Sequence, residues 1–178
     1  KPTMIPYDEA GYMDIAPDDR GENVRREICL TLEQMGICPE SSHHEEGPGQ
    51  NEIDFRYSDA LKAADDAMTF RTVAKTVAHR NGLAADFGAK PLEGQPGNGF
   101  HINVSVKNVS GKENRDLLNH VTAGILEKSR DMTLFLNPTE TSYRRLGQNK
   151  APIYISWSHE NRSQLVRIPA AAGEYRRA

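Results

Sequence analysis

Two segments of the sequence combine acidic, imidazole and amide side chains in patterns that could bind a metal ion. In the first, residues 42–52, His43, His44 and Glu45 precede a Gly-Pro-Gly turn, and Glu52 follows it. A hairpin at this turn would bring Glu45 and Glu52 together, and carboxylate pairs suit Mg²⁺ or Mn²⁺. A zinc-protease motif is excluded, because no second histidine follows at the required spacing. Each of the two histidines has either a structural role or a ligand role.

The second segment, residues 100–106, alternates strictly between apolar and polar side chains. Because side chains alternate across a strand, one face would be apolar and the other would carry His101, Asn103 and Ser105. Residues 51–57 show the same pattern, with Ile53 and Phe55 on one face and Glu52 on the other. Each polar face is either solvated or a site where carboxylates and an imidazole hold a divalent metal.

Glycines and arginines surround these segments. Residues 94–99, GQPGNG, precede a strand instead of opening a helix, so they do not fit a dinucleotide fingerprint. They form either a tight turn or a place where a ligand approaches the backbone closely. Arginines on the C-terminal third either are solvated or bind an anionic ligand. Together with a metal they are the groups that phosphoryl transfer needs; they are Arg144, Arg145, Arg162, Arg167, Arg176 and Arg177.

The elements that must position these residues are read from hydrophobic periodicity and turn residues. Residues 1–20 hold three prolines and read as an extended arm. Helices are predicted over residues 21–36, 58–80 (with Ser58 as N-cap) and 113–136. Strands are predicted over 51–57, 83–87, 100–106, 153–157 and 164–168, with polar segments at 40–46 and 137–150. This mixed order favours an α+β fold with helices packed on one face of a sheet.

Bulk composition is that of an ordinary soluble globular domain. The chain has 178 residues and a net charge of −3, which argues against a nucleic-acid partner. No apolar run approaches the roughly 20 residues that span a bilayer. Two cysteines, Cys29 and Cys38, form neither a disulfide framework nor a zinc site, so we expect reduced thiols in a cytoplasmic protein.

The segment KPLEGQPGNGFHINVS, residues 90–105, resembles the ATP-region signature of the glutamine synthetase family. The segment SHHEEGPGQNE (42–52) resembles the family's second metal-ligand segment. NPTETSYRRL (137–146) and NRSQLVRIP (161–169) resemble its arginine segments. The resemblance extends over nearly all of the chain from Gly11 onward. It implies that residues 1–178 are part of one catalytic domain, with a curved, mainly antiparallel sheet and helices on one face, truncated at both ends.

The resemblance also implies an activity and a set of residue roles. The family ligates ammonia to L-glutamate with ATP, through a γ-glutamyl phosphate, in large rings whose subunits complete one another's active sites. Glu45 and Glu52 would hold one Mg²⁺ or Mn²⁺ and His101 the other. Glutamate would contact Arg145 and Gly97, and Arg162 would stabilise the transferring phosphoryl group. The nucleotide would contact five residues: Tyr57, Asn103, Ser105, Arg167 and Arg177.

Three departures from the family pattern leave alternatives open. Pro96 stands where many members carry an asparagine that binds glutamate, and Lys150 stands where members place a glutamate that attracts ammonium. Further carboxylate and arginine ligands of the family have no counterpart in these 178 residues. We therefore expect this chain to be inactive by itself. The alternatives are a ligase for another amine, such as a polyamine, and a non-catalytic binding module.

Overall fold

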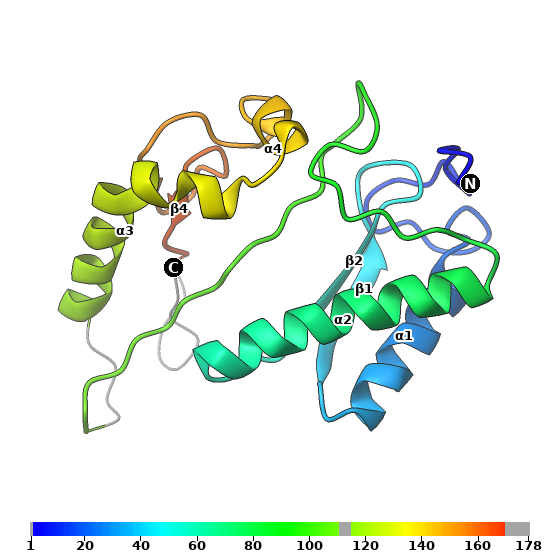
Figure 1. Ribbon diagram of the computed structural model, residues 1–178, viewed down its shortest axis with the longest axis horizontal. Coiled ribbons are helices and arrows are strands. Elements are labelled where there is room, and N and C mark those ends of the chain that lie inside the picture. The colour runs from blue at the N-terminus through cyan, green and yellow to red at the C-terminus, as the bar shows by residue number, and fades with distance from the viewer. Residues whose placement is uncertain (1, 111–114, 170–178) are drawn as a thin grey trace. The chain divides into compact units, whose positions relative to one another are not determined.

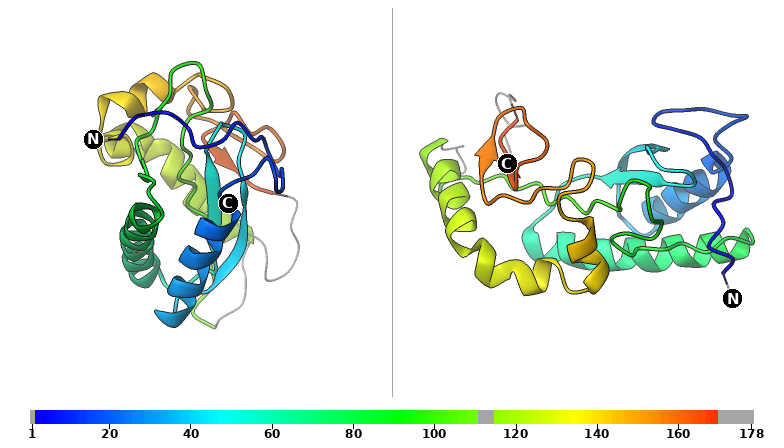
Figure 2. Two further views of the ribbon diagram at one scale, coloured as in Figure 1. Left: turned by 90° about the vertical axis from the view of Figure 1, so that its right-hand side faces the viewer. Right: turned by 90° about the horizontal axis from the view of Figure 1, so that it is seen from above.

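The computed structural model describes residues 2–110 and 115–169, so the predicted nucleotide contact Arg177 lies outside the described residues. The chain divides into two compact units. The first comprises Lys1–Phe87 and Pro91–Pro96, and the second comprises Gly88–Lys90 and Gly97–Ala178. Each unit is described by itself below, and Figure 1 and Figure 2 show their elements.

The first unit is built on an antiparallel hairpin, β1 (Pro39–His44) and β2 (Asn51–Phe55). The register pairs His43 with Glu52, and the Glu45 N–H donates to the Gln50 carbonyl at 2.8 Å to close the turn. The predicted strand over 51–57 is confirmed for Asn51–Phe55. The sequence indicated only a polar stretch at 40–46, and the structure shows that most of it belongs to β1. Its sequence lacks alternation, and pairing with β2 is what makes it a strand.

Two helices pack on one face of this hairpin, as the sequence predicted. They are α1 (Glu22–Gln34) and α2 (Ala60–Arg80), and α1 lies along β1 and β2 (Figure 1). Gly36, at φ +80°, ends α1, and the Ile37 N–H then donates to the Leu32 carbonyl at 2.9 Å. The N-cap of α2 is Asp59 and not the predicted Ser58.

The core of the first unit lies between these helices and the apolar face of β2. Leu32 and Val77 are its most buried side chains, and Ile53 and Phe55 pack against them. The predicted division of β2 into an apolar and a polar face is therefore confirmed. Residues 2–20 form no helix or strand, and polar contacts tie them to the hairpin and to α1.

The second unit contains α3 (Arg115–Leu136), α4 (Glu140–Arg145), β3 (Trp157–Ser158) and β4 (Val166–Arg167). The short strands β3 and β4 pair in parallel. β4 lies inside the strand predicted over 164–168, whereas β3 overlaps the one predicted over 153–157 only at Trp157. The segment 137–150, predicted as a loop, contains α4. Its signal was the N-cap Thr139, whose hydroxyl accepts the Ser142 N–H.

The strands predicted over 83–87 and 100–106 were wrong, because neither segment is assigned to a strand. An alternating pattern gives an extended segment two faces, but a ladder also needs a hydrogen-bonded neighbour. Within residues 2–110 and 115–169 no strand pairs with residues 100–106. Their apolar side chains stay uncovered, with Phe100 75% and Ile102 62% exposed.

The mixture of helices with a small antiparallel sheet confirms the α+β class. None of the helices in the described ranges is long and apolar enough to cross a membrane.

Candidate functional site

The polar face of the β1–β2 hairpin gathers three side chains that can each offer a ligand atom. These atoms of His43, Glu52 and Asp54 all lie within 4.8 Å of one another. His43 and Glu52 are direct cross-strand partners, with Nε2 3.8 Å from Oε1. Asp54 lies two residues along β2 on the same face, where it accepts a hydrogen bond from Ser41. Imidazole and carboxylate ligands on one strand face can hold a divalent cation.

Glu45 lies at the end of β1, where the hairpin turns. Its carboxylate is near enough to that of Glu52 to influence the pKa of Glu52. Partial burial, the charge of Asp54 and the neighbouring Glu45 raise the pKa of Glu52 from 4.5 to about 7. A carboxyl group in this setting resists ionisation unless a cation is present. The donor types of His43, Glu52 and Asp54, with Glu45 nearby, fit Mg²⁺ or Mn²⁺, and the assignment of Glu45 and Glu52 as ligands stays a prediction.

The two neighbouring histidines have different surroundings. His44 is fully buried, and its Nε2 lies 3.0 Å from Asp8 Oδ1, so it has the structural role that the sequence left open. His43 faces the carboxylate cluster and packs edge-on against Tyr12. Sequence reasoning did not single out His43 or Asp54 as ligands. Alternation along β2 puts Asp54 on the same face as Glu52, whereas the cross-strand register, which only the structure gives, places His43 opposite Glu52.

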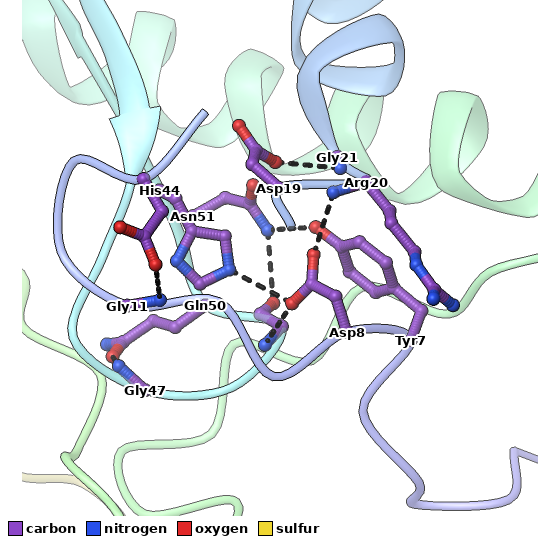
Figure 3. A network of polar contacts seen from close by, with 12 residues as sticks. Tyr7, Asp8, Gly11, Asp19, Arg20, Gly21, His44, Gly47, Gln50 and Asn51 are labelled. Atoms are coloured by element: carbon purple, nitrogen blue, oxygen red, sulfur yellow. Dashed lines mark hydrogen bonds and ion pairs between the residues drawn. The ribbon is translucent and has the colours of Figure 1, made fainter. Parts of the chain in front are cut away.

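Polar contacts join residues 7–21 to the hairpin (Figure 3), and Arg25 on α1 adds to them. The Arg25 guanidinium and the Asp19 carboxylate form a buried two-bond ion pair, at 2.6 and 3.0 Å. Arg25 also donates to Ser42 on β1 and to Asn51 on β2. The hydrogen bond from Arg25 lowers the pKa of Asp19. No motif in the sequence marks these residues, because their partners are distant along the chain.

In the second unit, the structure brings Gly97, Gly99, His101 and Arg145 together. A Cβ atom at Gly97 would lie 2.9 Å from Arg145 Cδ and 2.8 Å from the Ala89 carbonyl oxygen. A Cβ atom at Gly99 would lie 3.0 Å from His101 Nε2 and 3.5 Å from an Arg145 nitrogen. The Asn98 N–H donates to the Ala89 carbonyl at 3.0 Å and fixes the loop. Glycine is needed here because of close approach, which was one of the two interpretations of the Gly-rich segment.

Arg145 is half-buried at the end of α4. Its guanidinium has no hydrogen bond or ion pair with any residue that the structure describes, whereas the adjacent Arg144 pairs with Glu140. Burial alone lowers the pKa of Arg145. A half-buried cation with unused donors is suited to bind an anion such as a carboxylate.

Among the described residues, the other predicted site residues are exposed. Asn103 and Ser105 lie on the extended segment after His101, Arg162 lies in a turn, and Arg167 lies in β4. Tyr57 lies just after β2 and is also exposed. The predicted set is thus divided between the two units, with Glu45, Glu52 and Tyr57 in the first.

Comparison with known proteins gives a consistent result. The family described as "Glutamine synthetase, catalytic domain" matches residues 2–178. A glutamine synthetase of Staphylococcus epidermidis is 47% identical over 97% of this chain, and one of Staphylococcus aureus is 46% identical over the same share. The chain spans 41% of the length of each of these relatives.

Solved structures agree with the sequence relatives. The chain resembles Plasmodium falciparum glutamine synthetase with a TM-score of 0.87 and 26% identity, over 96% of this chain and 35% of that one. It resembles GmaS, solved as an ADP complex, with a TM-score of 0.79 and 29% identity, over 92% of this chain and 42% of that one. The chain therefore belongs to the glutamine synthetase catalytic-domain family.

Proposed function

We propose that the protein carrying this chain ligates ammonia to L-glutamate with ATP, through a γ-glutamyl phosphate. The observation that carries the proposal is the cluster on the β1–β2 hairpin, where ligand atoms of His43, Glu52 and Asp54 all lie within 4.8 Å of one another. The pKa of Glu52, raised to about 7 by burial and by the neighbouring carboxylates, supports it. Carboxyl groups held close together despite their mutual repulsion are typical of divalent-cation sites in enzymes that handle phosphate.

Glu45 and Glu52 would hold one Mg²⁺ or Mn²⁺, with His43 and Asp54 close enough to complete or orient the site. A cation bound there would neutralise phosphate oxygens. His101, beside Gly99 in the second unit, is the proposed ligand of a second cation. These assignments rest on the donor types and on membership of the family.

Arg145 is proposed to bind a carboxylate of glutamate. Its unused, half-buried donors support this role, and Gly97 keeps the backbone close enough to contact the same substrate. Arg162 would stabilise the transferring phosphoryl group, whose developing charge is best met by a fixed cation. For ATP, the solved GmaS–ADP complex is the supporting comparison. The proposed nucleotide contacts are Tyr57, Asn103, Ser105, Arg167 and Arg177.

The test is glutamine formation by the protein at its full natural length. We expect product only when ATP, glutamate, ammonium and Mg²⁺ or Mn²⁺ are all present, and little product from Glu52→Gln. If no glutamine forms, calorimetry with ATP and Mg²⁺ distinguishes the two explanations. Binding without product would point to another acceptor, whereas no binding would indicate a non-catalytic module.

A second candidate is ligation of glutamate to another amine, such as a polyamine. Lys150 favours it, because this residue is an exposed cation in the segment that follows Arg145 and would repel ammonium. A screen of primary amines and polyamines alongside ammonium would decide between the acceptors. Turnover with ammonium alone would reject this candidate.

We also propose that the protein assembles into rings and resides in the cytoplasm. Exposed apolar side chains at the end of α3, Leu134 and Phe135, support self-association. The free thiols of Cys29 and Cys38 support a reducing compartment. Light scattering of the full-length protein tests the first proposal, and cell fractionation tests the second.

A further inference from the structure

The arm at residues 2–20 places one acidic side chain, Asp8, deep against the hairpin that carries Glu45. Asp8 has three hydrogen-bonding partners, and its side chain is only 1% exposed. The Gly49 N–H donates to Oδ1 at 2.9 Å, and the Arg20 N–H donates to Oδ2 at 3.1 Å. His44 Nε2 is the third partner, 3.0 Å from Oδ1 (Figure 3).

His44 extends this contact to the backbone of Glu45. The ring is fully buried, and its Nδ1 lies 2.7 Å from the Glu45 carbonyl oxygen. A carbonyl oxygen can only accept, so Nδ1 donates this hydrogen bond. Asp8 therefore reaches Glu45 through one imidazole ring and holds Gly49 directly.

Both ends of the turn 45–49 are thus attached to a single carboxylate from a distant part of the chain. Asp8 is separated by 36 residues from His44 and by 41 residues from Gly49. The turn carries Glu45, whereas its partner Glu52 stands on the regular strand β2. The position of Glu45 relative to Glu52 therefore depends on how firmly the turn is held.

We propose that Asp8 is a positioning residue, acting through His44 and Gly49 to hold Glu45 where it can share a cation with Glu52. The proposal rests on the function proposed above, in which these two carboxylates bind Mg²⁺ or Mn²⁺. Groups that orient a metal ligand through hydrogen bonds typically change metal affinity about 10–100-fold when removed. A purely structural Asp8 would affect stability and leave the affinity of folded protein unchanged.

Asp8→Asn is the main variant, because it keeps the shape of the side chain. The amide has one acceptor oxygen, so it cannot retain all three hydrogen bonds. His44→Gln is the second variant, which keeps a donor towards Asp8 and loses the one towards Glu45. Asp14→Asn is the chemical control, since Asp14 is an exposed carboxylate in the same arm and its side chain accepts a hydrogen bond from the neighbouring Gly11 N–H. Val77→Ala, in the core of α2, is the stability control.

Two measurements on the full-length protein test the proposal: Mn²⁺ affinity by calorimetry, and hydrogen–deuterium exchange over residues 44–51 without metal. We expect Asp8→Asn and His44→Gln to weaken Mn²⁺ binding about tenfold or more and to speed exchange in this segment. Asp14→Asn and Val77→Ala should keep the Mn²⁺ affinity and the exchange rate within twofold of wild type. Each variant is measured at the same number of degrees below its own melting temperature.

The proposal is overturned if Asp8→Asn matches Val77→Ala in exchange and in affinity. It is also overturned if exchange rises while the Mn²⁺ affinity is retained, because the turn would then be held without benefit to the site. If the wild-type protein binds no Mn²⁺, the proposed function fails. Unchanged exchange in Asp8→Asn would then separately reject the positioning role. Should Asp8→Asn fail to fold, His44→Gln decides by the same two measurements.

Discussion

The two candidate clusters, one on the hairpin and one at Gly97–Arg145, are held in place by different physical means. The hairpin cluster is acidic, and hydrogen bonds and buried ion pairs from distant residues support it, among them Asp8–His44 and Asp19–Arg25. The Gly97–Arg145 cluster is basic and owes its form to close approach of the backbone to a side chain. Its arginine keeps its donors unused among the described residues.

This difference teaches what each cluster can tolerate. A site positioned by hydrogen bonds loses geometry when a remote polar partner is removed, even if its own ligands remain. A site shaped by close packing loses geometry when volume is added next to it. Substitutions of these two kinds should therefore affect the two clusters selectively.

The largest effect is expected from Arg145→Ala in the full-length enzyme. Loss of a half-buried cation that meets a substrate carboxylate should lower kcat/KM for glutamate about 10²–10³-fold. Steady-state kinetics with varied glutamate provides the measurement, and Arg144→Ala is the control, because Arg144 is engaged with Glu140 on the exposed side of α4. Equal losses in the two variants would contradict an anion-binding role for Arg145.

The buried ion pair behind the hairpin gives the second prediction. Asp19→Asn leaves Arg25 buried with one carboxylate fewer and should reduce the free energy of unfolding by about 3 kcal/mol. Because the folded pKa of Asp19 is lowered, its stabilising contribution is present at neutral pH and is lost as the pH falls below its ordinary value of 3.8. Urea denaturation at pH 7 and at pH 3 measures both effects, and the variant should differ less from wild type at pH 3.

Gly97→Ala tests the close-packed cluster. The new Cβ would stand 2.8 Å from a backbone oxygen and 2.9 Å from Arg145, so the loop or the arginine must move. A displacement of this size should lower kcat/KM for glutamate about 10–100-fold. Mn²⁺ binding at the hairpin should stay within twofold. If both fall together, the two clusters do not respond independently and the contrast drawn above is wrong.

The pH dependence of cation binding sharpens the description of the hairpin cluster. The raised pKa of Glu52 means that the folded protein keeps a proton between pH 4.5 and about 7 that the unfolded chain releases. Stability without metal therefore falls as the pH rises through this window. A cation must displace this proton, so Mn²⁺ affinity should rise about tenfold from pH 6 to pH 8. Glu52→Gln should abolish this dependence, and Glu40→Gln, an exposed change on β1, should preserve it.

How far the sequence predicts this molecule depends on whether a feature is local. The helices α1 and α2 and strand β2 follow from periodicity and from glycines such as Gly36, which act within a few residues. The pairing of Glu45 with Glu52 follows from a turn that the sequence marks plainly. The predicted hairpin implied an arm before this turn, but the extent of β1 could not be read from the sequence, because a polar segment becomes a strand only through its partner. The strand predicted at 100–106 was wrong because, among the described residues, this alternating segment has no partner strand.

The support of the site was beyond sequence reasoning for the same physical reason. Asp8 and His44 are 36 residues apart, and neither their residue types nor their spacing predicts that they form a buried pair. His43 and Asp54 were visible as polar residues, but only the register places His43 opposite Glu52. Arg145 and Gly97 were assigned to one substrate through family resemblance alone. Their contact in the structure supplies the steric reason for a glycine at that position.

The smallest effect is expected from Gly124→Ala on α3, which calibrates Gly97→Ala. A Cβ atom at Gly124 would meet nothing within 4 Å, and the residue lies inside a helix, so alanine should raise the free energy of unfolding by about 0.5–1 kcal/mol. Thermal denaturation and glutamate kinetics of both variants measure the contrast. Gly124→Ala should stabilise α3 and leave kcat/KM unchanged. Gly97→Ala should lower kcat/KM. An activity loss at position 124 would show that helix packing, and not the approach of Gly97 to Arg145, controls the cluster.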